Sequence, residues 1–212
     1  MISACLILLD EDYWIRQCLD ALRTYQVDEV IVVDGGSSDQ TVPIIRAEYP
    51  EVKLFERPMP FSFAEQRNFA KAQASGEWIL SLDGDETLRG AELLPALVQD
   101  TSAICFSIPT DHVDGGQTDS DPHIRLFANR DDLVWEREVH EYLSFAGEAL
   151  LAHPCHMGSQ SEFIRWTPEV VLVHWAYTAP PEKLQAKAER YKKYNVLGTG
   201  IQVNSVEDLR PR

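Results

Sequence analysis

The chain has 212 residues, enough for one compact α/β domain. Hydrophobic residues make up 44% and charged residues 25%, a composition typical of a globular protein and not of a disordered segment. Its 19 Lys and Arg against 34 Asp and Glu give a formal net charge of −15, which argues against nucleic acid or an anionic membrane as the main partner. An acidic nucleotide ligand is not excluded, because a metal ion can screen like charges locally.

The cysteines and the N-terminus bear on where the protein works. The four cysteines are scattered without a CxxC pair, which favours a reduced, intracellular protein. The N-terminus has no basic region and its apolar run stops at Asp10, so we expect neither a signal peptide nor a membrane span. We therefore expect a cytoplasmic protein, or a peripheral one at the inner face of the membrane, and the sequence leaves its oligomeric state open.

The first hundred residues alternate between strand-like and helix-like segments. Apolar runs of strand length predict strands at 2–9, 29–33, 52–55 and 77–82. Apolar residues at helical spacing predict helices at 15–22, 42–49 and 62–74. Asp39 is expected to cap the second helix, and Ser62 with Glu65 has capping-box spacing at the start of the third. This alternation predicts a parallel sheet covered by helices on both faces.

Regularity falls after about residue 100, so we expect a less regular second half. Strands are predicted at 103–108, 124–127 and 170–175, and a last helix at 182–194. Residues 111–121, rich in Asp and Gly, are predicted to form a polar loop, and the tail from Gly198 to be loose. We expect a single domain over residues 1–212.

Acidic residues follow three of the predicted strands. They are Asp10 with Glu11, Asp34, and Asp83 with Asp85. Each alone is as readily a turn former, but ligands of open parallel sheets bind beyond the carboxyl ends of the strands. The three together favour a ligand site at this edge of the sheet.

The sharpest motif is LDGDE at residues 82–86. Two carboxylates spaced i, i+2 around a glycine leave room for a hard cation and a bulky polyanion. Mg²⁺ or Mn²⁺ typically takes one or two carboxylates, with phosphate oxygens and water completing the octahedron. A simple β-turn is the bland alternative, and the position directly after a buried strand favours the metal site.

These segments resemble family-2 glycosyltransferases of the GT-A fold. The resemblance lies in VVDGGSSDQT and in QRNFAKAQASGEWILSLDGDE. It implies that Asp34 contacts the nucleotide base, that Arg67 lies near the nucleotide, and that Asp83 and Asp85 hold ribose, metal and diphosphate. The first strand departs from the family pattern, since Asp10-Glu11 replaces the common Pro-x-Tyr-Asn, and we place Glu11 among the nucleotide-binding residues.

A narrower resemblance involves the second half. IRLF and VHEYL in residues 124–143, and VVLVHW before a Lys-rich helix, are similar to small bacterial lipopolysaccharide-core β-glucosyltransferases. The resemblance implies a nucleotide-binding half at about 1–100 and an acceptor-binding half at about 101–197. It also implies that His174 completes the metal site or contacts diphosphate, although a core or turn histidine is the bland alternative.

An inverting transfer needs a general base, which we assign to Glu141 with Asp111 as runner-up. Glu141 stands in the apolar stretch VHEYL, where partial burial would raise its pKa, and a surface ion pair is the bland alternative. His140 beside it and Arg125 are further candidates, the latter because a guanidinium suits diphosphate or carboxylate oxygens.

Two other clusters are weighed against their bland alternatives. The last helix carries five basic residues between Lys183 and Lys193, for which we favour a solvated face over a site for an anionic acceptor. His153, Cys155 and His156 form an HxCH cluster, but a structural zinc site needs four ligands, and no second pair accompanies it.

The sequence therefore predicts an α/β glycosyltransferase with Mn²⁺ or Mg²⁺ as cofactor. It would move a sugar from a nucleotide diphosphate donor to a hydroxyl acceptor such as a cell-surface glycan or lipopolysaccharide-type precursor. Inversion and a UDP donor are both implied by the resemblance. A nucleotidyltransferase is one alternative, disfavoured because residues 10–12 lack the Gly-rich basic loop such enzymes usually have. A non-catalytic nucleotide-sugar binding module is the other.

Overall fold

The computed structural model describes residues 1–58, 62–99, 102–113, 122–152, 162–175 and 178–194. In chain order the elements are β1 (Ile2–Leu8), α1 (Ile15–Thr24), β2 (Glu29–Asp34), α2 (Thr41–Glu48), β3 (Lys53–Glu56), α3 (Phe63–Ala72), β4 (Trp78–Asp83), β5 (Glu86–Arg89), a 3-10 turn (Ala91–Leu93), α4 (Leu94–Leu97), β6 (Cys105–Ile108), β7 (Thr110–His112), β8 (His123–Ala128), β9 (Leu133–Glu136), β10 (Tyr142–Phe145), β11 (Glu148–Ala149), β12 (Ile164–Trp166), β13 (Val171–His174) and α5 (Pro181–Tyr194).

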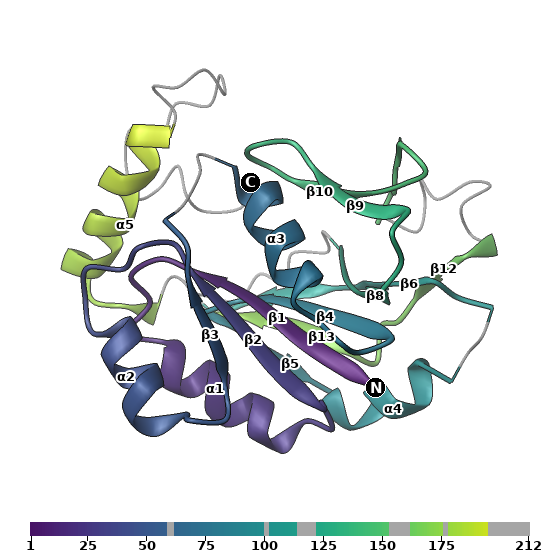
Figure 1. Ribbon diagram of the computed structural model, residues 1–212, viewed down its shortest axis with the longest axis horizontal. Helices are drawn as coiled ribbons and strands as arrows, with labels where there is room; N and C mark the ends of the chain where they lie inside the picture. The colour runs from purple at the N-terminus through teal and green to yellow at the C-terminus, as the bar shows by residue number, and fades with distance from the viewer. Residues whose placement is uncertain (59–61, 100–101, 114–121, 153–161, 176–177, 195–212) are drawn as a thin grey trace.

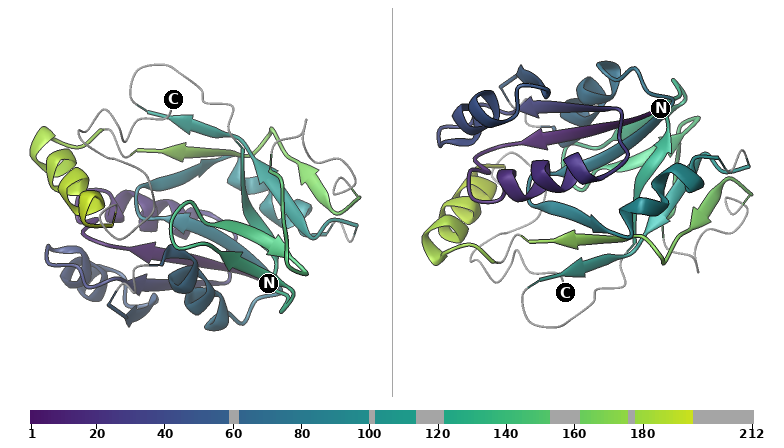
Figure 2. Two further views of the ribbon diagram at one scale, coloured as in Figure 1. Left: turned by 90° about the horizontal axis from the view of Figure 1, so that it is seen from above. Right: turned by 90° about the horizontal axis from the view of Figure 1, so that it is seen from below.

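A seven-stranded sheet forms the centre of the molecule, in the order β12-β6-β8-β4-β1-β2-β3. Strands β3, β2, β1 and β4 are mutually parallel, and β8 runs antiparallel between β4 and β6. Figures 1 and 2 show α1 and α2 on one face of this sheet and α3 on the other. All seven residues of β1 are buried, as expected for a central strand covered on both faces.

Two small sheets flank the large one. Strand β13 lies between β5 and β7, antiparallel to β5 and parallel to β7. Strands β9, β10 and β11 form an antiparallel sheet, which contacts α3 through β9. Helix α5 lies near the carboxyl ends of the parallel strands, above α2 in the view of Figure 1.

Each face of the large sheet has its own buried core. On one face, Ile15, Leu19 and Leu22 of α1 belong to the same cluster as Leu6 and Leu80 of the sheet. On the other, the small residues of α3 join a cluster with aromatic and aliphatic side chains from β8, β9 and β10, namely Phe127, Trp135 and Leu143. Each fully buried large apolar side chain contributes about 1.5–3 kcal/mol to the free energy of folding. The two cores therefore fix the strands of the large sheet, and with them the residues at the strand ends.

The predicted elements of the first half are confirmed within one or two residues. The Ser62 side chain accepts a hydrogen bond from the Glu65 backbone N–H at 3.2 Å, as the capping spacing predicted. Asp39 accepts from the Thr41 backbone N–H at 2.9 Å and so serves the first turn of α2, although Gln40 is the residue at the N-cap position.

The second half is more regular than the sequence predicted. Strands β7, β9, β10, β11 and β12 were not expected, and β7 takes in the first residues of the segment predicted to be a loop. Strands of two to four residues leave too few alternating positions for a period to stand out. The rest of that segment, the tail from residue 198 and the HxCH cluster of His153, Cys155 and His156 lie outside the described residues.

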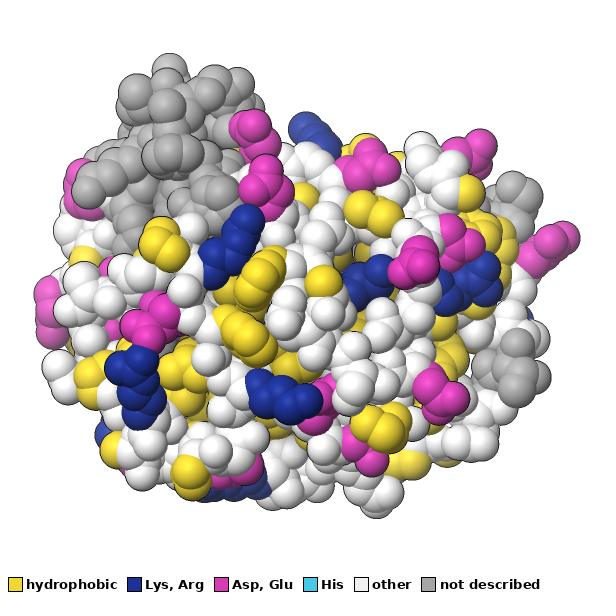
Figure 3. Space-filling view, in the orientation of Figure 1, with side chains coloured by type: hydrophobic (Ala, Val, Ile, Leu, Met, Phe, Trp, Pro, Cys, Tyr) yellow, Lys and Arg dark blue, Asp and Glu magenta, His cyan; other side chains and the backbone are white. Residues whose placement is uncertain are grey.

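Figure 3 shows how charged side chains are distributed on one face of the molecule. On the face shown, Lys and Arg side chains are scattered among Asp and Glu and do not gather in one stripe. Within the described segments, no helix is long and apolar enough to cross a membrane.

Candidate active site

The register of the parallel strands gathers the predicted acidic residues at one edge. Leu8 of β1 is paired with Asp34 of β2, and Ile7 of β1 with Asp83 of β4. The chain then turns at 84–85 into β5, whose Glu86 is paired with His174 of β13. Strand ends distant in sequence therefore meet at the carboxyl edge of the sheet.

Gly84 is required by the packing between the two aspartates. A Cβ built on Gly84 would lie 2.6 Å from Leu8 Cδ2 and 3.0 Å from Glu11 Cγ. A side chain there would push apart the end of β1 and the start of α1. The glycine thus lets Glu11 approach Asp83 and Asp85.

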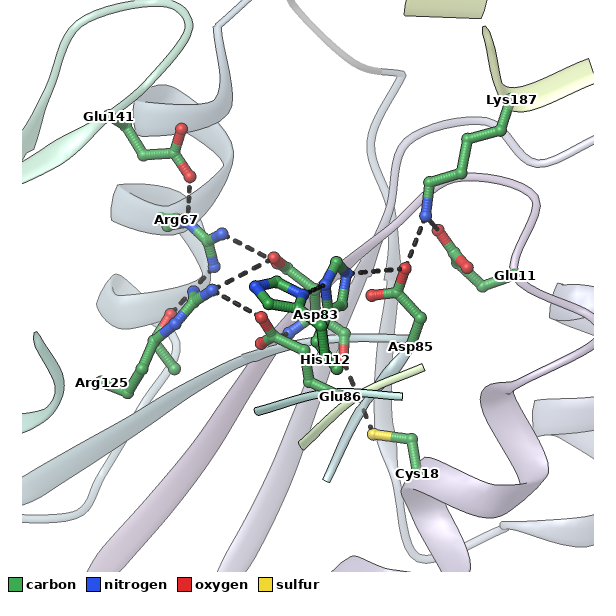
Figure 4. A network of polar contacts seen from close by, with 12 residues as sticks. Glu11, Cys18, Arg67, Asp83, Asp85, Glu86, His112, Arg125, Glu141 and Lys187 are labelled. Carbon is green, nitrogen blue, oxygen red and sulfur yellow. Dashed lines mark hydrogen bonds and ion pairs between the residues drawn. The ribbon is translucent and has the colours of Figure 1, made fainter. Parts of the chain in front are cut away.

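Asp83 is held between two arginines (Figure 4). Its Oδ1 accepts from Arg67 Nη2 at 2.8 Å, and its Oδ2 lies 3.4 Å from Arg125 Nη2. Arg67 is 5% exposed and Arg125 8%, so both guanidiniums are fixed within the protein. Desolvation acts to raise the pKa of Asp83, but the two guanidiniums outweigh it and the pKa is lowered. Asp83 is therefore ionised.

Asp85 faces two cationic groups on the other side. Its Oδ2 accepts from Lys187 Nζ at 2.6 Å and lies 3.4 Å from His174 Nε2. The Asp85 side chain is only 3% exposed. Its pKa is lowered, because Lys187 and His174 outweigh the desolvation that burial imposes. Burial also disfavours the charged His174, yet Asp85 raises the pKa of its imidazole.

Glu86 belongs to the same cluster but was not among the predicted site residues. Its Oε1 accepts from Arg125 Nη2 at 2.7 Å, and its Oε2 accepts from the Asp83 backbone N–H at 2.8 Å. Burial raises its pKa to about 7, which Arg125 only partly offsets. Its position directly after DGD, at the start of a strand, was the available signal in the sequence.

Glu11 is 8% exposed and reaches the cluster from the turn between β1 and α1. Its Oε1 lies 3.4 Å from Lys187 Nζ, and its Oε2 has no hydrogen-bond partner among the described residues. Burial raises its pKa to about 8, against the opposing effect of Lys187. The predicted nucleotide-binding residue thus lies beside the predicted metal-binding pair.

Asp34 lies at the same edge with its carboxylate turned into its own loop. The backbone N–H groups of Gly36 and Ser37 both donate to Oδ2 at 2.9 Å, and the Ser37 hydroxyl donates to Oδ1. Asp34 is 1% exposed. This carboxylate organises the loop after β2, and its predicted contact with a base remains a prediction.

Glu141 reaches Arg67 from the loop between β9 and β10. Its Oε1 accepts from Arg67 Nε at 2.7 Å, and its side chain is 14% exposed. Arg137 and His140 of this loop have positive φ angles of 74° and 56°, a conformation costly for residues with a Cβ. The predicted base is therefore linked through one guanidinium to Asp83.

Asp111, the second candidate for the general base, lies on β7. Asp111 is ion-paired with Arg89 at 3.2 Å, and the Arg89 side chain is 62% exposed. The next residue, His112, faces His174, with their Nδ1 atoms 3.0 Å apart. Alternation along the strand thus sends Asp111 and His112 to opposite faces.

The solvated face expected for the basic helix is wrong for its first two lysines. Lys187 contacts Asp85 and Glu11, and Lys183 forms an ion pair with Asp12. Their i, i+4 spacing places both on the face of α5 that meets the acidic loops. That spacing was the signal in the sequence, but a helix face cannot be matched to a distant partner without the fold.

The donor set fits a divalent cation in part. The described residues contain no group of three or more His, Cys, Asp or Glu side chains arranged to hold a metal. Mg²⁺ and Mn²⁺ are commonly bound through one or two protein ligands plus phosphate oxygens, and Asp85 with His174 offers an adjacent carboxylate and imidazole. Both Asp83 oxygens face guanidiniums, so Asp85 and His174 are the better-placed pair.

Comparison with known proteins places this geometry in context. Residues 3–161 match the model of Glycosyl transferase family 2. A TPR repeat-containing protein of Synechococcus elongatus is 34% identical over 91% of this chain and 46% of its own length. The lipopolysaccharide core biosynthesis glycosyltransferase LpsC of Rhizobium meliloti is 33% identical over 46% of this chain and 37% of its own. The chain thus spans less than half the length of these relatives.

Solved structures share the fold at lower identity. S. aureus TarS (residues 1–349) has a TM-score of 0.60 at 18% identity, over 95% of this chain and 67% of that one. The mannosyltransferase PcManGT from Pyrobaculum calidifontis, in complex with GDP-Man and Mn²⁺, has a TM-score of 0.61 at 18% identity, over 92% of this chain and 61% of that one. The common part includes nearly all of the present chain.

Proposed function

Because the chain belongs to glycosyl transferase family 2 and has the GT-A fold, we propose that it transfers a sugar from a nucleotide diphosphate donor to a hydroxyl acceptor. The observation that carries the proposal is the meeting of Asp83, Asp85 and His174 at the carboxyl edge of the parallel strands. Ligands of such sheets bind at this edge. The family match favours glycosyl transfer over the nucleotidyl transfer considered from sequence.

A UDP-sugar is the donor we propose. TarS was solved with UDP and UDP-GlcNAc, and the glucosyl-3-phosphoglycerate synthase of Mycobacterium tuberculosis with Mn²⁺ and UDP-Glc, whereas PcManGT was solved with GDP-Man. In this chain the loop after β2, organised by Asp34, would bind the nucleotide base. Glu11 and Arg67 would lie beside the ribose and diphosphate.

The diphosphate would be held through Mn²⁺ or Mg²⁺ by Asp85 and His174, with Asp83 next to them. A cation bound there would stabilise the charge that develops on the leaving diphosphate, a contribution of several kcal/mol. The chain's own part is electrostatic. Arg67 and Arg125 hold Asp83 ionised and in place, so the site does not reorganise as charge moves.

Glu141 is the proposed general base. The acceptor oxygen would bond to the anomeric carbon, the bond from that carbon to the diphosphate oxygen would break with its electron pair on the diphosphate, and the hydroxyl proton would pass to Glu141. Such a single in-line displacement inverts the anomeric centre. Arg67 holds Oε1 of Glu141, which fixes the orientation of the whole carboxylate.

We propose a cell-surface glycan or lipopolysaccharide-type precursor as the acceptor. The support is the match to LpsC and the position of Glu141 in the loop between β9 and β10, within the half of the chain expected to bind the acceptor. The three described cysteines are buried free thiols, which favours a cytoplasmic site of action.

A panel of nucleotide sugars tests the proposal. We expect UDP-sugars to raise the melting temperature with Mn²⁺ or Mg²⁺ and to lose this effect with a chelator, because a ligand that binds the native state stabilises it. Release of UDP with a hydroxyl acceptor would then be measured. Equal stabilisation with chelator would remove the metal from the proposal, and binding without any turnover would favour a binding module.

A further inference from the structure

Lys187 is a cation built into the candidate active site from the last helix. Its Nζ lies 2.6 Å from Asp85 Oδ2, 3.4 Å from Glu11 Oε1 and 5.1 Å from the centroid of the Trp14 ring. The Lys187 side chain is 16% exposed. Figure 4 shows it approaching Asp85 from the side opposite Arg67 and Arg125.

Several contacts independent of Lys187 hold this helix at the site. Ala188, the residue after Lys187, is 1% exposed, so the helix packs against the rest of the protein at this point. The chain leading into the helix is tied to α1, since the Trp14 indole N–H donates to the Trp175 carbonyl oxygen at 3.0 Å. The position of the Lys187 ammonium is therefore set by the packing of the helix, and not by the ion pair alone.

The charge balance of the site gives Lys187 a role that the arginines do not fill. Arg67 is engaged by Glu141, Ser81 and Asp83, while Arg125 is engaged by Asp83 and Glu86. Both are buried and planar, so neither can turn without leaving a carboxylate unpaired. Lys187 lies on the Asp85 side, where a diphosphate held through that carboxylate would place its oxygens.

A nucleoside diphosphate brings more negative charge than one divalent cation neutralises, into a protein whose net charge is already −15. An ammonium on a flexible stem presents three donors around a point charge, so it can serve a phosphate oxygen without losing its carboxylate. A guanidinium fixed in a fork lacks this freedom. The chemistry at this position therefore suits a diphosphate.

We propose that Lys187 is a donor-binding residue that contacts the diphosphate of the nucleotide sugar. This rests on the proposed function, since it needs a donor at Asp85. It implies that α5 supplies part of the donor site, and that Glu11 positions the ammonium between itself and Asp85. The recognition is of phosphate charge, and not of base or sugar.

The test compares K187M with K183M, which removes the same charge from the same helix one turn away. Affinities for UDP, UMP and uridine would be measured by calorimetry in Mn²⁺. K187M should bind UDP about ten-fold or more weakly, as expected for loss of a charge-assisted hydrogen bond, and UMP should be less affected. Uridine affinity should change by less than about two-fold in both variants, and K183M should bind all three ligands like wild type.

A second variant separates binding from folding. K187R keeps the positive charge, so it should retain more UDP affinity than K187M, and melting curves would show that α5 remains docked in each. Equal UDP affinity in wild type and K187M, or an equal loss for uridine and UDP, would overturn this inference alone. A wild-type protein that binds none of these ligands would overturn the proposed function, and the inference with it.

Discussion

Carboxylates at the two ends of the parallel strands differ in their hydrogen-bond partners and in the charges around them. At the amino ends, Glu29 accepts hydrogen bonds from the Ser75 backbone N–H at 2.6 Å, the Ser75 hydroxyl at 2.8 Å and the Gly76 backbone N–H at 3.2 Å. Ser3 and Lys53 also donate to it. Although desolvation opposes them, these partners lower its pKa to about 2. This carboxylate links β2 to β1, to β3 and to the turn that precedes β4.

At the carboxyl ends, acidic side chains crowd one another. Burial, with a smaller contribution from the nearby Asp85, raises the pKa of Glu86 to about 7 and that of Glu11 to about 8. Crowded buried charge destabilises a fold and is typical of functional sites. The same residue type thus joins strands at one edge and gathers in the candidate active site at the other, and the difference lies in how fully hydrogen-bond partners satisfy each carboxylate.

Replacing Asp85 by Asn should have the largest effect. We expect kcat/KM for sugar transfer to fall by roughly 10⁴-fold or more, because weaker donor binding adds to the loss of the cation's several kcal/mol. The matched control at the other edge is E29Q, which should keep the kcat/KM of wild type when assayed below its melting temperature. Similar losses in both variants would remove the functional distinction between the edges.

Replacing Glu141 by Gln tests the role of this residue as the general base. Gln has nearly the same size and its amide oxygen can still accept from Arg67 Nε, so the fold and UDP affinity should be retained while kcat falls by about 10²–10⁴-fold. Single-turnover measurements at saturating acceptor would isolate the transfer step. Near-normal turnover would move the role elsewhere, with Asp111 the next residue to replace.

Replacing Glu29 by Gln should lower the free energy of unfolding by about 1–3 kcal/mol at neutral pH, with no effect on UDP affinity. The folded pKa of Glu29 lies below its unfolded value of 4.5, so its contribution is present above that value and is lost as pH falls towards 2. Urea unfolding between about pH 7 and pH 3 should therefore show the wild-type advantage shrinking with acid. A constant difference would mean that the Glu29 charge is not what stabilises this edge.

The smallest effect is expected from Ser62→Ala at the start of α3, the helix that carries Arg67. Loss of the cap should cost about 1 kcal/mol in thermal or urea unfolding. Arg67 lies more than one turn inside the helix, so KM for the donor should stay at its wild-type value. A raised KM would show that the arginine side of the site depends on the end of the helix as well as on its own ion pairs.

The sequence by itself determined the strand–helix alternation of the first hundred residues and the acidic ends of β1, β2 and β4. It also indicated the family, through the resemblance of VVDGGSSDQT and QRNFAKAQASGEWILSLDGDE to family-2 glycosyltransferases. These features are local: burial on two faces reads as a continuous apolar run, and a cap depends on residues three apart. They were therefore visible without any partner in space.

Only the tertiary structure decided which side chains surround Asp83 and Asp85. Arg125 arrives on an antiparallel strand, His174 through the register of β13 with β5, and Lys187 from a helix 102 residues along the chain from Asp85. No periodicity in the sequence reports such pairings, because they follow from strand register and helix docking. Lys187, which the sequence analysis assigned to solvent, faces Asp85 and Glu11 for that physical reason.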